Sequence, residues 1–223
     1  VATVPELRIA FSLPALLRGR VAPAAVELVA PRLSAIRAVD GTFHLDIRND
    51  TGPDDPAATD RILTDLVTAL RSPPDPTEPL GALTSLRITD AVLAVENRQT
   101  GTAWTVPRFG LSLARDASGV RGTASADLDL GGRINRLDAT VVYRVEDGGL
   151  GVTAALADVR PADYSQIAPV LAPLQALDVA FGGSVTLDLD GDLRPLGLTI
   201  DLTGGAGSLS LPGDLRVPVA LVT

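Results

Sequence analysis

The sequence predicts a mainly β protein: a curled antiparallel sheet that forms an open groove, with one main helix and short helical turns. Three observations support this prediction. Apolar and polar residues alternate with a period of two in several stretches, which is typical of strands with one apolar face. Short turn segments rich in Gly, Asp and Ser separate these stretches, which favours an antiparallel meander over βα units. Aromatic residues make up only 3% of the chain, so aliphatic side chains must form nearly all of the apolar face.

The first part of the chain predicts an N-terminal β unit, which we place at residues 1–48. Residues 7–13 alternate apolar side chains with polar or small ones, and residues 43–47 repeat this pattern directly after the turn pair Asp40-Gly41. A one-turn helical piece is expected between these two stretches, at residues 14–18.

Residues 49–79 predict a loop–helix–loop insertion. Apolar residues recur at helical spacing from Ala57 to Arg71, and Pro73-Pro74 ends the helix. The flanking segments 49–56 and 72–79 are rich in Pro and Asp, as solvated connections usually are. We therefore expect this helix to lie over one edge or mouth of the sheet.

Residues 80–223 predict an extended antiparallel β region. The alternation returns at residues 128–130, 185–189, 196–202 and 209–221, with turns rich in Gly between these stretches. Residues 161–177 predict short helical turns that Pro169 and Pro173 interrupt.

A sheet with one apolar face must cover that face, and two alternatives follow. The sheet closes on its own aliphatic face, or it curls without closing and leaves a trough lined with Leu, Val, Ile and Ala. Such a trough is a liability in water unless it binds an apolar ligand, for which acyl chains are the natural candidate. Periodicity alone leaves both alternatives open, and composition alone favours the closed core.

The composition argues against several function classes. Without Cys and with the single histidine His44, the chain has no thiolate nucleophile and no ordinary zinc site. It contains no Gly-x-Ser-x-Gly nucleophile elbow, and the acidic stretch 188–192 lacks the spacing of a calcium loop. We therefore predict no enzyme activity and no catalytic, cofactor-binding or metal-binding residue. The formal net charge of −8, with no basic block, argues against a nucleic-acid partner.

No stretch reaches the roughly 20 apolar residues that a membrane-spanning helix needs. Any signal peptide or anchor is expected to lie outside these 223 residues.

The order of several segments resembles the AsmA-like superfamily of bacterial envelope proteins, the group of AsmA, TamB and YhdP, and is nearest to the YhdP-type branch. Each segment is a β pattern of low specificity, and the likeness lies in their succession over most of the chain. The segments are residues 16–21, 26–33, 37–43, 86–91 with Trp104 after them, 159–162, 177–179 and 183–187. The membrane helix and most of the long repeated β region typical of the family are missing, which fits a piece of a larger protein.

The resemblance implies a periplasmic β-taco, anchored to the inner membrane through a segment outside this chain. Its groove would carry phospholipid acyl chains between the inner and outer membranes, with further protein partners in the periplasm or outer membrane. The alternative function is a scaffold for outer-membrane protein assembly and envelope integrity. The resemblance implies no catalytic residue and no cofactor. The expected groove-lining residues are Leu7, Ile9, Phe11, Phe43, Leu45, Ile47, Trp104, Val185, Leu187, Leu189, Leu198, Ile200 and Leu202.

Overall fold

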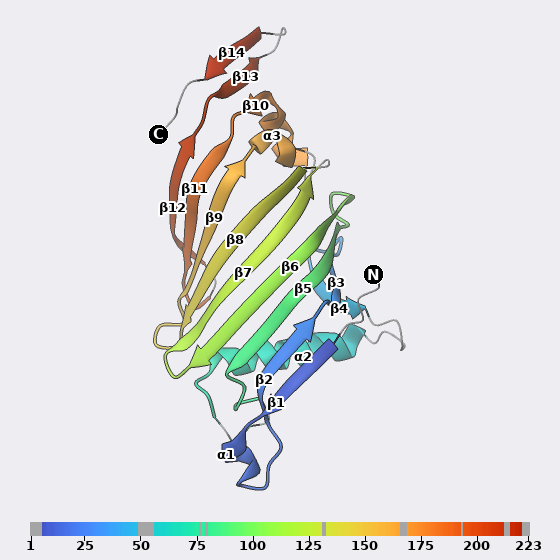
Figure 1. Ribbon diagram of the computed structural model, residues 1–223, viewed down its shortest axis with the longest axis vertical. Coiled ribbons are helices and arrows are strands. Elements are labelled where there is room, and N and C mark those ends of the chain that lie inside the picture. The colour runs from blue at the N-terminus through green and yellow to red at the C-terminus, as the bar shows by residue number, and fades with distance from the viewer. Residues whose placement is uncertain are drawn as a thin grey trace.

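The computed structural model describes residues 6–48, 56–75, 77–78, 80–130, 133–165, 169–192, 194–211 and 215–219. These residues form a mainly β molecule built on one large curled sheet that does not close into a barrel (Figure 1). The predicted fold class is thereby confirmed, and of the two alternatives for the apolar face the open one is observed.

The large sheet has eleven described strands. They are β1 (Glu6–Phe11), β2 (Pro23–Val29), β3 (Arg32–Arg37), β4 (Phe43–Arg48), β5 (Ser85–Asn97), β6 (Thr102–Asp116), β7 (Gly119–Leu130), β8 (Arg133–Arg144), β9 (Leu150–Val159), β11 (Phe181–Leu189) and β12 (Pro195–Gly204). Their spatial order is β1-β2-β5-β6-β7-β8-β9-β11-β12, with β3 beside the second half of β5 and β4 beside β3. A separate small sheet contains β10 (Leu177–Asp178), β13 (Gly207–Leu211) and β14 (Leu215–Val219).

The sheet is mixed, which differs from the purely antiparallel sheet that the sequence predicts. Strands β2 and β3 both run parallel to β5, and every other pairing is antiparallel. A parallel pairing needs a long crossover connection. Here β4 and the helix α2 (Pro56–Arg71) lie in the chain between β3 and β5 and serve as that crossover. The N-terminal strands therefore belong to the same sheet as the later β region.

Strands β2 and β3 follow one another along β5, with a break in the backbone between them. Ala30 at this break and Asp90 beside it in β5 both have a positive φ, of 51° and 52°. The pairing continues across the break, because the Ala30 N–H donates to the Thr89 carbonyl over 2.8 Å and the Val92 N–H donates to the Pro31 carbonyl over 3.0 Å. Asp90, in the left-handed region, lies where β5 shifts register against β6, between Ile88 and Ala91.

The predicted helices are confirmed. The main helix α2 begins at Pro56 and ends at Arg71, and a one-turn helix α1 spans Leu13–Leu16. The Ser12 side chain caps α1 by accepting the backbone N–H of Ala15. The stretch with Pro169 and Pro173 forms a short helix α3 (Pro161–Tyr164) and a 3₁₀ helix η1 (Pro169–Ala176).

The buried core is small for a chain of this length. Among the described residues, Leu83 and Val179 are the largest fully buried side chains. The accessible surface is 13678 Å², whereas a compact monomer of this mass exposes about 9,600 Å². Several large apolar side chains of the large sheet are exposed, among them Leu7, Ile9, Leu198 and Ile200.

Candidate functional site: the apolar face of the sheet

Two rows of apolar residues cross the sheet from β1 to β12 on one side, which we call the apolar face. The pairing register fixes both rows, because directly paired residues on neighbouring strands point to the same side of a sheet. The first row is Leu7, Leu28, Ile88, Leu111, Ala124, Ala139, Ala154, Val185 and Ile200. The second row is Ile9, Val26, Leu86, Leu113, Gly122, Val141, Val152, Leu187 and Leu198. Neither row contains a charged or hydrogen-bonding side chain.

The opposite side, which we call the polar face, carries hydrophilic residues at the intervening positions. The row between the two apolar rows is Arg8, Glu27, Arg87, Ser112, Thr123, Thr140, Thr153, Thr186 and Thr199. Neighbours in this row interact, since the hydroxyls of Thr153 and Thr186 lie 3.1 Å apart and Arg8 forms an ion pair with Glu27. The sheet thus separates an apolar side from a hydrophilic one over its whole width.

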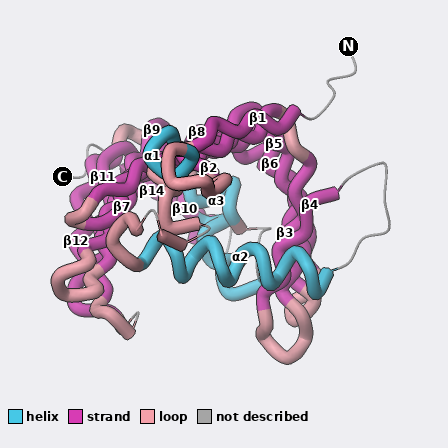
Figure 2. The backbone as a smooth tube through the Cα atoms, turned by 90° about the horizontal axis from the view of Figure 1, so that it is seen from below, coloured by secondary structure: helices cyan, strands magenta, loops and turns pink. Residues whose placement is uncertain are grey.

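Contacts of α2 show that this helix lies on the apolar side. Tyr143 pairs with Val120 and Leu150 and so extends the apolar face by a further row. Its hydroxyl donates to the carbonyl of Arg71 over 3.3 Å, and the Arg71 guanidinium carbon lies 5.9 Å from the centre of the tyrosine ring. Arg71 also donates to the carbonyl of Gly191 in the β11–β12 hairpin. Figure 2 shows α2 running across the open side of the curled sheet, as the sequence predicts.

Arg115 fixes the connection that follows α2. Its side chain is only 5% exposed and projects from the end of β6 on the apolar side, where it pairs with Val120. The guanidinium donates to five backbone carbonyls, those of Ser72, Pro73, Leu80, Gly81 and Leu83. Burial lowers the pKa of Arg115 and the carboxylate of Glu78 acts in the opposite direction, but an arginine in a protein stays charged. This side chain therefore holds residues 72–73 and 80–83 against the sheet.

No second layer of described residues covers the apolar face. At its two edges, Leu7 is 58% exposed, Leu198 62% and Ile200 58%. The central residues of both rows are half-buried, apart from the buried Leu86 and Gly122, and the fully buried Leu83 and Val179 belong to neither row. The face is thus a broad open surface under α2 and not an enclosed cavity.

Six of the residues predicted to line a groove lie in the two apolar rows, namely Leu7, Ile9, Val185, Leu187, Leu198 and Ile200. Leu189 and Leu202 extend the face along β11 and β12, where they pair with Leu150 and Gly183. Phe11 is 51% exposed and follows the bulge at the end of β1, and the half-buried Trp104 pairs with Val95. Phe43, Leu45 and Ile47 belong to β4, and their side chains lie outside the described residues.

The sequence analysis did not single out the part of the apolar face that β2, β5 and β6 contribute. These residues are Val26, Leu28, Leu86, Ile88, Leu111 and Leu113. In β5 and β6 the alternation changes phase at register shifts between Ile88 and Ala91 and between Ala91 and Leu93, so no long stretch keeps one period. Asp90 interrupts the apolar stretch of β5 at this register shift, and its φ is positive.

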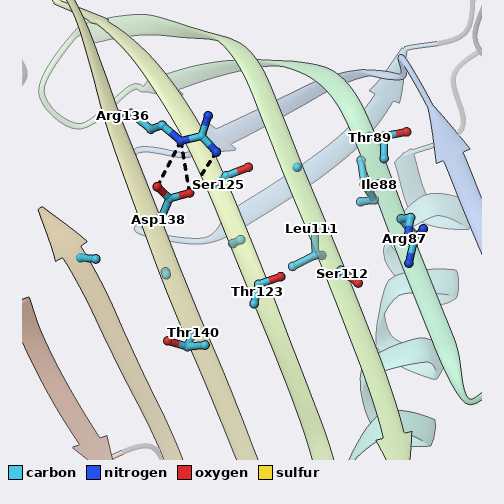
Figure 3. A pocket seen from close by; sticks show the side chains of 14 residues that line it. Arg87, Ile88, Thr89, Leu111, Ser112, Thr123, Ser125, Arg136, Asp138 and Thr140 are labelled. Atoms are coloured by element: carbon cyan, nitrogen blue, oxygen red, sulfur yellow. Dashed lines mark hydrogen bonds and ion pairs between the residues drawn. The ribbon is translucent and has the colours of Figure 1, made fainter. Parts of the chain in front are cut away.

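One depression lies on the polar face (Figure 3). It has a volume of about 580 Å³, and side chains of Arg87, Ser112, Thr123, Ser125 and Thr140 line it. Arg136 and Asp138 at its border form an ion pair, with nitrogen and oxygen 3.1 Å apart. It is shallow, its lining also includes Ile88, Leu111, Ala124 and Ala139, and none of the predicted lining residues belongs to it.

The described residues contain no group of three or more His, Cys, Asp or Glu side chains that could hold a metal ion. The acidic stretch 188–192 forms a turn, in which the carboxylate of Asp190 accepts the backbone N–H groups of Asp192 and Arg194, each over 2.9 Å. His44 is exposed, and its Nε2 lies 3.3 Å from the hydroxyl of Thr42.

No family model, curated protein or solved structure matches this chain. None of the helices in the described part of the chain is long and apolar enough to cross a membrane. The fold is therefore described from the structure of this chain alone. The resemblance to the AsmA-like superfamily stays a prediction.

Proposed function

We propose that this chain is a periplasmic, AsmA-like segment that holds phospholipid acyl chains on its apolar face and lets them pass between the inner and outer membranes. The observation that supports the proposal is the pair of apolar rows, which cross nine strands without a polar side chain and which no described layer covers. In this proposal the inner membrane is reached through an anchor outside this chain.

The sizes of the residues in the first apolar row suit an extended hydrocarbon chain. The central strands β7, β8 and β9 contribute Ala124, Ala139 and Ala154, whereas larger aliphatic side chains stand on either side, such as Leu111 and Val185. Three adjacent strands span roughly 10 Å, since neighbouring strands lie about 4.8 Å apart. This leaves a lower patch in the middle of the first apolar row, which Leu137 and Val141 of β8 and Val152 and Leu156 of β9 border along the strands.

The energetics favour binding without specific contacts. Each methylene group removed from water contributes about 0.8 kcal/mol, and this contribution needs no directional partner. An acyl chain on a surface without polar side chains can therefore slide at nearly constant free energy. The head group stays in water, outside the apolar face.

A pair of substitutions in β11 tests the proposal. Leu187→Asp places a carboxylate on the apolar face, whereas Thr186→Asp places the same charge one residue away on the polar face. We expect Leu187→Asp to abolish copurification of phospholipid, because a buried carboxylate without a partner is strongly unfavourable beside acyl chains. Thr186→Asp should retain it. Lipid extraction and native mass spectrometry of both variants provide the measurement, with circular dichroism as the check on folding.

Two results count against the proposal. In the first, the purified parent protein contains no phospholipid and takes up none from vesicles. In the second, Leu187→Asp and Thr186→Asp lose lipid equally while both remain folded, so that the loss does not depend on the apolar face.

A second candidate function, a scaffold for outer-membrane protein assembly, is favoured by the free edges of β1 and β12, to which no other described strand pairs. Photo-crosslinking separates the two functions. Crosslinks from strand edges to a client protein favour the scaffold, and acyl probes trapped on the apolar face favour lipid binding.

A further inference from the structure

The free edge of β12 is the part of the large sheet that most clearly offers a pairing site for another strand. In the described structure β12 pairs with β11 on one side only, over nine residue pairs from Phe181 with Gly204 to Leu189 with Pro195. It is the outermost strand in Figure 1, and all of its ten residues except Leu202 and Gly204 are exposed. A long strand edge carries a row of backbone N–H and C=O groups, and another β-strand is the partner that satisfies such a row.

Few charged residues keep other strands away from this edge. Natural edge strands are usually kept apart by charged residues or proline. Between Pro195 and Gly204 the only charged residue is Asp201, while Leu196, Leu198 and Ile200 are 69%, 62% and 58% exposed. The other end of the sheet differs, because β1 carries Glu6 and Arg8, which form an ion pair.

A second copy of the same strand fits this edge by symmetry. In an antiparallel pair of strands related by a twofold axis, the residue at the axis faces its own copy. Each of the remaining pairs then joins two residues that lie on the same face of the sheet. With Thr199 at the axis, Leu198 faces Ile200 and Leu196 faces Leu202 of the second copy. Asp201 then faces Gly197, so no two like charges are opposed. With Ile200 at the axis, Asp201 faces Thr199 and the faces match equally well.

The number of contacts suits a stable pair. An antiparallel pairing over a strand of this length forms about eight to ten backbone hydrogen bonds, close to the roughly ten of a standard interface. The apolar side chains of both copies also become covered by their new neighbours. We propose that two copies of this chain associate through β12, in antiparallel pairing about a twofold axis, so that their sheets join and the apolar face continues from one copy to the other.

The absence of cysteine from the sequence allows a direct test by single-cysteine crosslinking. Thr199→Cys and Ile200→Cys place a thiol at the two candidate axis positions, and directly opposed residues are close enough for a disulfide, whereas diagonal neighbours are not. Thr186→Cys, in the same row but on the interior strand β11, and Arg8→Cys, at the opposite edge, serve as controls. After mild oxidation we expect a disulfide-linked dimer from one of the two β12 variants and none from either control.

A matched pair of charge substitutions tests the same interface without oxidation. Ile200 and Leu7 are both 58% exposed on edge strands of the apolar face, at opposite ends of the first apolar row. Ile200→Lys brings two like charges together near the axis and should raise the dimer dissociation constant about tenfold or more, whereas Leu7→Lys should leave it unchanged. Analytical ultracentrifugation over a range of protein concentrations measures both.

Three outcomes overturn the proposal. They are a parent protein that stays monomeric at every concentration, a crosslink from Thr199→Cys to Arg8→Cys in a mixture of the two variants, and equal weakening by Ile200→Lys and Leu7→Lys. The proposal does not rest on lipid binding. A protein that dimerises through β12 without phospholipid keeps this inference and loses the proposed function, and a monomer that binds phospholipid does the reverse.

Discussion

At the scale of single residues, Arg115 does most to connect the helical insertion with the sheet. Its nitrogens lie 2.9 Å from the carbonyl oxygen of Pro73 and 3.0 Å from those of Ser72 and Leu83. These carbonyls belong to the connection between α2 and β5, in which the Leu80 and Gly81 carbonyls also accept backbone N–H groups, those of Leu83 and Asp75. The buried guanidinium of Arg115 donates to these backbone carbonyls, as the N–H groups of a neighbouring strand would do.

We expect Arg115→Met to lower the free energy of unfolding by roughly 2–5 kcal/mol, because several buried carbonyls lose their donor. Arg121→Met is the matched control, since Arg121 forms an exposed ion pair with Asp116 and should contribute less than about 1 kcal/mol. Urea unfolding followed by circular dichroism gives both values. Equal effects of the two substitutions would show that Arg115 is not an anchor.

The residues of the apolar face could be predicted wherever a strand keeps a single period. In β1, β11 and β12 the alternation alone placed Leu7, Leu187 and Ile200 on one side of the sheet, and the pairing register agrees. The alanines of β7 to β9 escaped prediction because small side chains produce weak alternation. The parallel pairing of β2 with β5 escaped as well, since it joins segments that are 60 residues apart.

At the scale of elements, the path of β11 depends on a glycine. Gly183 has a φ of 138°, and a Cβ at this position would collide with the backbone carbonyl of Asp201 in β12. The pairing between β9 and β11 shifts register at this point, between Phe181 and Gly183. Glycine is needed here because other residues rarely adopt this conformation and because the neighbouring strand passes so close.

We expect Gly183→Ala to cost about 1–3 kcal/mol of stability, from backbone strain and from displacement of β12. Gly197→Ala is the control in the partner strand, where the nearest atom to the added Cβ, an oxygen of Asp188, is 4.0 Å away. Thermal unfolding should separate the two variants by several degrees. A Gly183→Ala protein as stable as the control contradicts the close approach of the two strands.

At the scale of the whole molecule, the open sheet exposes apolar side chains to water, which is unfavourable. The two apolar rows end in exposed leucines and isoleucines at both edges, and the hydrogen bond between Tyr143 and Arg71 joins α2 to one end of the face. A patch of this extent normally binds a partner or associates with a second copy. The fold therefore fits a protein whose stability depends on what occupies that face.

This dependence gives a prediction for the intact protein. After delipidation with detergent and its removal, we expect the protein to bind the dye ANS, because the apolar face is left in contact with water. Added phospholipid vesicles should displace the dye and raise the melting temperature as the lipid concentration increases, since a ligand that binds only the folded state stabilises it by mass action. Ile200→Asp, with its charge on the apolar face, should reduce both effects, whereas Thr199→Asp on the polar face should not. If the delipidated protein binds no dye and melts at the same temperature with and without phospholipid, the apolar face does not bind acyl chains.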